Sequence, residues 1–233
     1  MVGVQSLTIT MRTHLSMSYL TSAALFSRKA HSMETGQSWD TVTNDQRSEH
    51  LAYATAAIVM AAAAIEAFVN ELFAECRDAG SRNDLNISPE KAELIGRIWT
   101  DVPRVERDSV LEKYDLVLRL LDLPALLRKN KPYQSAITLL DLRNKLMHYK
   151  LISREAGVFP SDQKLDDFEK KLREHFADSK LAAPGLPYFP HQTLGHGAAA
   201  WSVTTAVAFL DNFCQLLSTR PPYEHIRPTF LTQ

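Results

Sequence analysis

The sequence predicts an all-α protein, a helical bundle in a single domain. Almost every segment between turn signals repeats its apolar residues at helical spacing, and no run alternates Val, Ile or Thr as a strand would. Hydrophobic residues make up 45% of the chain and charged residues 23%, which is typical of folded rather than disordered proteins. The length of 233 residues, without an obvious internal repeat, fits one large domain covering the whole chain.

Two long helices are predicted in the N-terminal third of the chain. The first is His14–Glu34, and the polar, glycine-containing stretch 35–44 that follows it predicts a loop. The second runs from about Asp45 to Ala79 and ends in a Gly, Ser and Asn cluster at 80–83. Its alanine-rich part, Ala52–Ala74, has an apolar run shorter than the ~20 residues that a membrane span needs. We therefore expect a helix buried between other helices and no membrane association.

Two further helical segments and the start of a third are predicted in the middle of the chain. Ser88-Pro89-Glu90 combines a capping hydroxyl, a first-turn proline and an acidic residue, so it predicts a helix start, with the helix reaching about Trp99. A second helix is expected over Val105–Leu123, where the following proline interrupts it. Residues 129–132 are a polar connector, and the next helix is expected from Tyr133 to about Leu151.

The C-terminal third contains a predicted insertion and a predicted central helix. Ser161–Ser179 has a narrow apolar stripe, which indicates a surface helix, and Ala183–Gly197 is rich in Pro and Gly, which indicates a loop or lid. Ala198–Ser218 is apolar on most faces, so we expect it inside the bundle. The predicted core is therefore about 45–150 plus this last helix, and the predicted insertion spans about 155–197.

Charge and cysteine content limit the function classes. The net charge of −1 gives no global basic field, so nucleic-acid binding would depend on a local patch or on an oligomer. Cys76 and Cys214 lie in apolar helical patterns, which favours two buried thiols over one disulfide. No Cys/His cluster suggests zinc, and we expect neither a metal nor another cofactor. The N-terminus lacks the apolar core of a signal peptide, so a cytoplasmic location is expected.

The most informative segment is LRNKLMHYK, residues 142–150, near the end of a predicted helix. Four residues separate Arg143 from His148, and Asn144 directly follows the arginine. This spacing alone means little, because about one or two copies are expected by chance in a chain with eight His. A second copy does occur, at Arg220–His225, in a proline-containing stretch that we expect not to be helical. Only the first copy combines a helix, the asparagine and flanking apolar anchors.

An upstream segment strengthens the interpretation of the first copy. The long second helix contains AIEAFVNELF at residues 64–73, which places Glu66 and Asn70 four apart on one face. Together, the two segments make the chain resemble the HEPN-domain family. That resemblance implies an up-and-down helical bundle and a metal-independent endoribonuclease with a toxin or defence role. It also implies a homodimer whose two motifs line one RNA-binding cleft, and an inhibitory protein partner.

The chemistry explains why these residue types suit RNA cleavage. Attack by the neighbouring 2′-hydroxyl needs one proton removed from that hydroxyl and one delivered to the leaving 5′-oxygen, and His148 is the candidate for either transfer. Arg143 can stabilise the extra negative charge of the phosphorane through paired hydrogen bonds, and Asn144 can orient the phosphate or the imidazole. The other expected site residues are supporting positions and RNA contacts: Glu66 and Asn70, and Lys145, Tyr149 and Lys150.

Helix geometry leaves alternatives open. Positions five apart lie ~140° around a regular helix, so Arg143 and His148 do not both face one phosphate unless the helix frays, the arginine reaches around or a second copy contributes. The resemblance favours the second copy. Alternatively, Arg143 is a structural residue paired with Glu66 or Asp141, and His148 is a helix-end residue favoured by the helix dipole. The protein would then be a non-catalytic module that binds RNA, a nucleotide or a protein.

Overall fold

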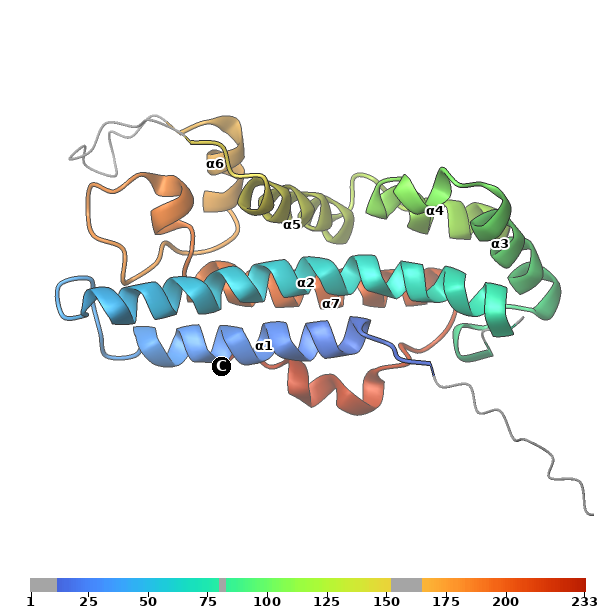
Figure 1. Cartoon of the computed structure of the whole chain (residues 1–233), viewed down its shortest axis with the longest axis horizontal. Coiled ribbons are helices and arrows are strands. Elements are labelled where there is room, and N and C mark those ends of the chain that lie inside the picture. Colours follow the sequence, from blue (N-terminus) through green and yellow to red (C-terminus); the bar gives the residue numbers. More distant parts are fainter. Residues whose placement is uncertain (1–11, 80–82, 152–164) are drawn as a thin grey trace, which may run out of the picture.

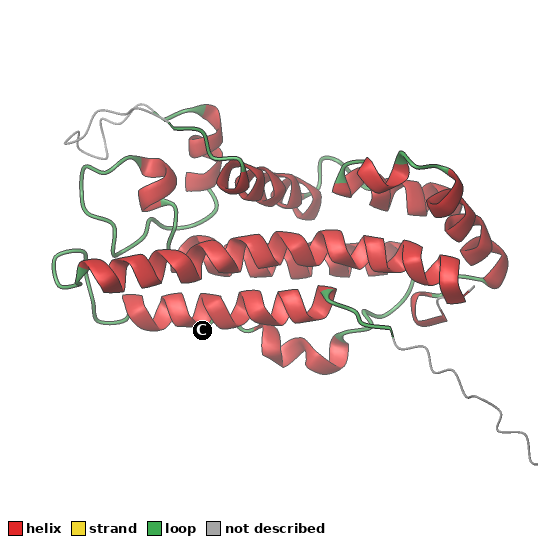
Figure 2. Ribbon diagram, in the orientation of Figure 1, coloured by secondary structure: helices red, strands yellow, loops and turns green. Residues whose placement is uncertain are grey.

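The computed structural model describes residues 12–79, 83–151 and 165–233. Within these ranges the chain is largely helical and has no β-strand, which confirms the predicted all-α bundle (Figures 1 and 2). The α-helices in these ranges are α1 (Ser16–Glu34), α2 (Asn44–Ala79), α3 (Pro89–Asp101), α4 (Val110–Leu120), α5 (Lys131–Met147), α6 (Asp167–Arg173) and α7 (His196–Leu216).

The long helix α2 is the centre of the bundle. It packs along α1 and α7 and also contacts α3, α4 and α5 (Figure 1). By length and composition α2 is the one described helix that could cross a membrane, but 50% of its most apolar stretch is buried inside the protein, as in a core helix. Cys76 on α2 and Cys214 on α7 are buried and unbridged, which confirms the prediction of two thiols.

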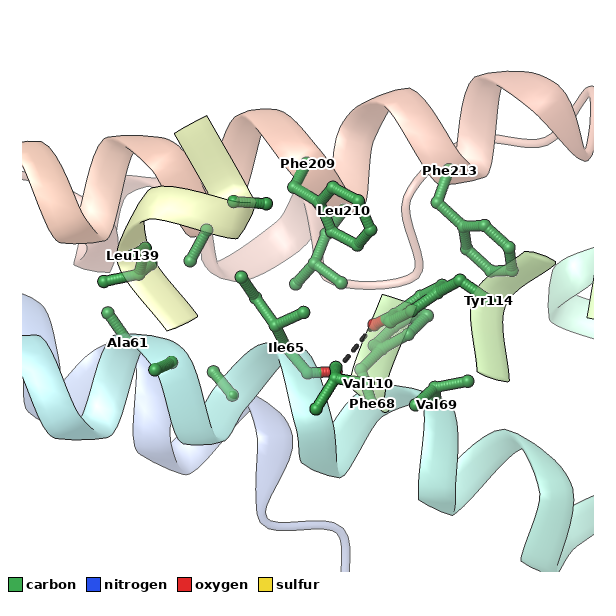
Figure 3. Close-up of a cluster of buried hydrophobic side chains, with 14 of the residues drawn as sticks. Ala61, Ile65, Phe68, Val69, Val110, Tyr114, Leu139, Phe209, Leu210 and Phe213 are labelled. Atoms are coloured by element: carbon green, nitrogen blue, oxygen red, sulfur yellow. Dashed lines mark hydrogen bonds between the residues drawn. The ribbon is translucent and has the colours of Figure 1, made fainter. Parts of the chain in front are cut away.

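Aromatic packing joins α4 to the central helices. The ring of Tyr114 on α4 lies edge-on to Phe209 and Phe213 of α7, with ring centroids 4.9 and 4.7 Å apart (Figure 3). Its hydroxyl donates a 2.7 Å hydrogen bond to the backbone carbonyl of Ile65 on α2. Because this fully buried phenol has an acceptor, its burial carries no unsatisfied polar group. The contact holds the N-terminal part of α4 close to the α2 face that carries Glu66.

The prediction of one continuous helix over 105–123 is wrong. Val105–Arg107 forms a single 3₁₀ turn, and Ser109 then adopts an extended conformation before α4 begins. Ser109 and Glu112 form a capping box, in which each side chain accepts a hydrogen bond from the other residue's backbone N–H. A new helix therefore starts at this point. At its other end Asp122 has a φ of 58°, which ends the helix before the proline.

Both predicted ends of α5 need correction. Asn130 caps the N-terminus, so Pro132, predicted as part of a connector, lies in the first helical turn. The helix ends at Met147 rather than at about Leu151, because His148 has non-helical backbone angles (φ −113°, ψ 41°). His148 is therefore the C-terminal cap residue, and the end of the motif lies outside the helix.

The predicted insertion is less helical than expected. The expected helix over 161–179 is reduced to the seven residues of α6, while 161–164 lie outside the described residues. A capping box between Asp166 and Glu169 starts α6. The predicted loop at 183–197 contains one helical turn at Tyr188–Gln192 and leads directly into α7.

The C-terminal tail lies against α1 (Figure 1). Residues 224–230 form a 3₁₀ helix, so the expectation of no helix around His225 is only partly met. Arg227 anchors this segment through hydrogen bonds of 3.0 and 2.9 Å to the carboxylate of Asp211 on α7.

Candidate functional site

The candidate site lies at the C-terminal end of α5. Leu139 and Leu142 are fully buried and fix the helix against the bundle, where α5 packs on α7 and α2. The neighbouring positions Asn144, Lys145 and His148 are exposed. Apolar spacing therefore anchors one side of the helix and leaves most of the motif accessible.

Arg143 lies beside Glu66 in a cavity between α5, α2 and the start of α4. Its guanidinium Nη2 is 3.0 Å from Glu66 Oε2, and the two side chains are 24% and 35% exposed. The Nε atom of Arg143 is buried and makes no hydrogen bond to any residue that the structure describes. The cavity has a volume of about 490 Å³, and Arg128 also lines it. Arg143 therefore has one engaged nitrogen and one buried donor still without an acceptor.

His148 lies in a second cavity, of about 720 Å³, between the end of α5, α6 and the segment before α7. Its backbone N–H donates to the carbonyl of Asn144 at 2.9 Å, which closes the last turn of α5. Its side chain is exposed. The imidazole is therefore accessible to a ligand.

Asp141 and Asn144 line both cavities, whereas Arg143 lines only the first of the two and His148 only the second. This arrangement matches the expected angular offset along a helix. The end of the helix at Met147 does not bring the two side chains into one cavity. One copy of the chain therefore presents the arginine and the histidine on different sides of α5.

Asn70, predicted as a supporting residue, is held by a lysine that sequence reasoning missed. Lys113 on α4 is only 2% exposed and donates a 2.9 Å hydrogen bond from Nζ to Asn70 Oδ1. Burial lowers the pKa of Lys113, although the carboxylate of Glu66 opposes that shift. Asn70 lines neither cavity. Its side chain therefore helps to hold α4 in place, and any effect of Asn70 on the candidate site acts through neighbouring residues.

The three expected RNA contacts, Lys145, Tyr149 and Lys150, all line the second cavity. Lys145 Nζ lies 4.7 Å from the centroid of the Phe168 ring, and the Tyr149 ring centroid is 6.3 Å from that of Phe189. Sequence reasoning missed both phenylalanines. Phe168 was visible only as part of an apolar stripe and Phe189 only as an aromatic residue in a loop, so neither carried a signal that linked it to α5.

Carboxylates outnumber the cationic side chains in both cavities. The first contains Arg128 and Arg143 with four acidic residues, namely Glu66, Asp108, Glu112 and Asp141. The second contains Lys145, Lys150 and Lys171 with Asp141, Asp166, Asp167 and Glu169. Neither cavity is a simple basic patch, so bare phosphate gains little from the overall charge of either.

Three side chains of the candidate site, those of Arg143, Asn144 and His148, can act on a ligand. No group of three or more His, Cys, Asp or Glu in the described part of the chain is arranged to hold a metal ion. Comparison of the chain with protein-family models, curated proteins and solved structures gives no match. The groups that can act are an accessible imidazole, a guanidinium with a spare donor and an exposed amide between them.

Proposed function

We propose that this protein is a metal-independent endoribonuclease of the HEPN type, which cleaves RNA through attack of the neighbouring 2′-hydroxyl. The observation that carries the proposal is the position of Asn144, which borders both the cavity of Arg143 and the cavity of His148. A phosphodiester bound at Asn144 would meet this amide together with the arginine of one cavity or the histidine of the other, and the remaining group would come from a second protomer. As a cytoplasmic toxin or defence enzyme, it would be restrained by an inhibitory protein.

Each side chain has a role that its surroundings support. His148 exchanges protons with the attacking 2′-oxygen or the leaving 5′-oxygen, since its imidazole is exposed. Arg143 stabilises the charge of the phosphorane, since its guanidinium lines a cavity and its side chain is 24% exposed. Glu66 holds the guanidinium in place until RNA arrives.

A second copy of the chain supplies the missing half of each site. Two large apolar side chains at and just after the end of α5 are exposed in the described part of the chain: Met147 is 61% exposed and Leu151 is 92% exposed. Exposed apolar groups beside a candidate site favour a protein contact there. In a symmetric dimer, Arg143 of one protomer would lie across the cleft from His148 of its partner.

A second candidate function is a non-catalytic module that binds RNA, a nucleotide or a protein. The observation that favours it is the ion pair between Arg143 and Glu66, which matches the purely structural alternative for this arginine. In that case the fold would be used for recognition, and His148 would only cap α5.

RNA cleavage by the purified protein in EDTA distinguishes these two functions. We expect cleavage by the wild type and a loss of about 100-fold or more in His148→Ala, because acid–base catalysis contributes at least that much. His225→Ala is the matched control, since His225 is also exposed and ends the second Arg-to-His copy. Undiminished cleavage by a folded His148→Ala protein would overturn the mechanism, and no cleavage by wild-type dimer would favour the binding module.

A further inference from the structure

The second cavity is lined by aromatic rings from three different segments. Tyr149 follows α5, Phe168 belongs to α6, and Phe189 precedes α7. The Phe168 and Phe189 rings are nearly perpendicular (82°), and their centroids are 6.3 Å apart. The ring centroid of Tyr149 is also 6.3 Å from that of Phe189. Phe189 is 6% exposed and forms a buried wall, whereas Tyr149 is 46% exposed.

The charges that line this cavity favour a ligand recognised through a planar ring rather than through an anion alone. Three lysines and four carboxylates line it, so a bare phosphate has no net attraction. Three of these carboxylates are already engaged within the protein, and one of them, Asp167, pairs with Lys170 at 3.0 Å. Asp166 and Glu169 form the capping box of α6, and Glu169 also accepts a hydrogen bond from the backbone N–H of Phe189 at 3.3 Å.

The position of Lys145 adds a contact for the anion. Its ammonium lies 4.7 Å from the centroid of the Phe168 ring, close enough for a cation–π interaction. A planar group stacked beside Phe168 would therefore have a positive charge within reach of its substituents. Asn144 and His148 border the same cavity, so such a ligand would lie beside the candidate catalytic groups.

We propose that this cavity binds one unpaired nucleobase of an RNA strand, stacked on Phe168 and Tyr149, with its phosphate near Lys145. The inference rests on the proposed function and adds a substrate class to it, namely single-stranded RNA. The volume of about 720 Å³ is that of an ordinary small-ligand site. Aromatic side chains bind unpaired bases of any sequence, whereas a base inside a duplex is already stacked and cannot enter.

Two of the recognition residues lie outside the motif itself. Phe168 and Phe189 belong to the segment between α5 and α7, whereas the motif belongs to α5. Part of the proposed base-binding surface therefore comes from outside the motif, although Asn144 and His148 line the same cavity. A change at Phe168 should alter RNA binding without removing any group from the proposed chemistry.

Equilibrium binding tests the inference on the wild-type protein. The probe is a fluorescent single-stranded oligonucleotide with 2′-fluoro sugars, which lacks the attacking hydroxyl, and the comparison is a blunt duplex of the same sequence. We expect the single strand to bind more tightly than the duplex, and Phe168→Leu to weaken that binding about 5-fold or more while Phe168→Tyr restores it. A nucleoside monophosphate should compete more strongly than inorganic phosphate at the same concentration.

The matched control is Phe26→Leu, which changes a partly buried phenylalanine of α1 that stacks on Tyr53 at 6.1 Å, away from the cavity. Circular dichroism confirms that each variant is folded. Equal affinity of wild type and folded Phe168→Leu for the single strand, or equal competition by inorganic phosphate, would overturn the inference. If RNA is cut but Phe168 has no effect, the inference fails alone; if Phe168-dependent binding occurs without cleavage, the endoribonuclease proposal fails alone.

Discussion

Arg143 and His148 lie five positions apart at the end of α5 and line different cavities, with Asn144 bordering both. The offset has a simple cause, because five residues turn a helix by ~140°. The end of the helix at Met147 does not remove that offset. This offset supports the proposal that a second protomer completes the catalytic site.

The ion pair between Glu66 and Arg143 should compete with RNA for the guanidinium. Glu66→Gln removes the competing charge but keeps an acceptor, so we expect RNA binding to tighten by about 2- to 5-fold at low salt. Fluorescence anisotropy measures this. Glu49→Gln is the control, because Glu49 is an exposed carboxylate on the same helix that accepts a hydrogen bond from Tyr53. Weaker binding by Glu66→Gln than by the control would mean that Glu66 positions Arg143 rather than competing for it.

Buried Lys113 should cost stability at neutral pH. Burial lowers the pKa of Lys113 in the folded state below its ordinary value of 10.5. Between these two pH values the unfolded chain binds more protons than the folded chain, so the free energy of unfolding rises with pH. Lys113→Met removes the buried charge and keeps the side-chain length. We expect the free energy of unfolding at pH 7 to rise by on the order of 1 kcal/mol, with a smaller gain in alkaline solution. Urea denaturation of wild type and variant at both pH values measures the difference; a variant less stable than wild type at pH 7 would contradict it.

A buried carboxylate fixes the junction between α1, α2 and α7. Glu34 Oε1 accepts hydrogen bonds from His50 Nε2 at 2.9 Å and from the backbone N–H of His196 at 2.8 Å. Burial by itself would raise the pKa of Glu34, but these hydrogen bonds outweigh it and lower the pKa below the usual 4.5. The stabilisation is therefore present above about pH 4.5 and is lost as the pH falls through the folded-state pKa.

Glu34→Gln tests that account. We expect a loss of about 1–3 kcal/mol in the free energy of unfolding at pH 7, because hydrogen bonds to a charged acceptor are replaced by neutral ones. The difference from wild type should shrink as the pH falls below 4.5 and through the folded-state pKa of Glu34, where the wild-type carboxylate becomes protonated. Glu93→Gln, at an exposed position, is the control. A difference that stays constant over this range would show that the charge of Glu34 is not responsible.

Local signals in the sequence were enough to predict most of the helices. Apolar periodicity predicted α1, α2 and α7 to within two residues at each end, and the Ser88-Pro89-Glu90 start of α3 is confirmed. The break before α4 also had a local signal, since Ser109 and Glu112 have capping-box spacing, and that signal was overlooked. Apolar periodicity continues across the break, and for this reason it predicts one helix where the structure has a 3₁₀ turn followed by α4.

The surroundings of the motif could not be predicted in the same way. Phe168 and Phe189 reach the end of α5 only through the path of the chain between α5 and α7, and nothing in local spacing encodes that path. Lys113 is similar, because a lysine on an amphipathic helix is ordinarily exposed, yet here its partner Asn70 lies 43 positions away. The sequence therefore shows which chemical groups are present, whereas the burial of a charged group depends on how the helices pack.

The proposed ribonuclease site shared between two protomers is tested most directly by mixing two inactive variants. The Arg143→Ala and His148→Ala proteins are each expected to be inactive alone. After subunit exchange, half of the dimers contain one protomer of each variant. If the sites are shared, each of these mixed dimers has one intact site out of two. About one quarter of wild-type RNA cleavage should therefore return. No recovery of cleavage, with exchange confirmed by labelled subunits, would contradict a shared site.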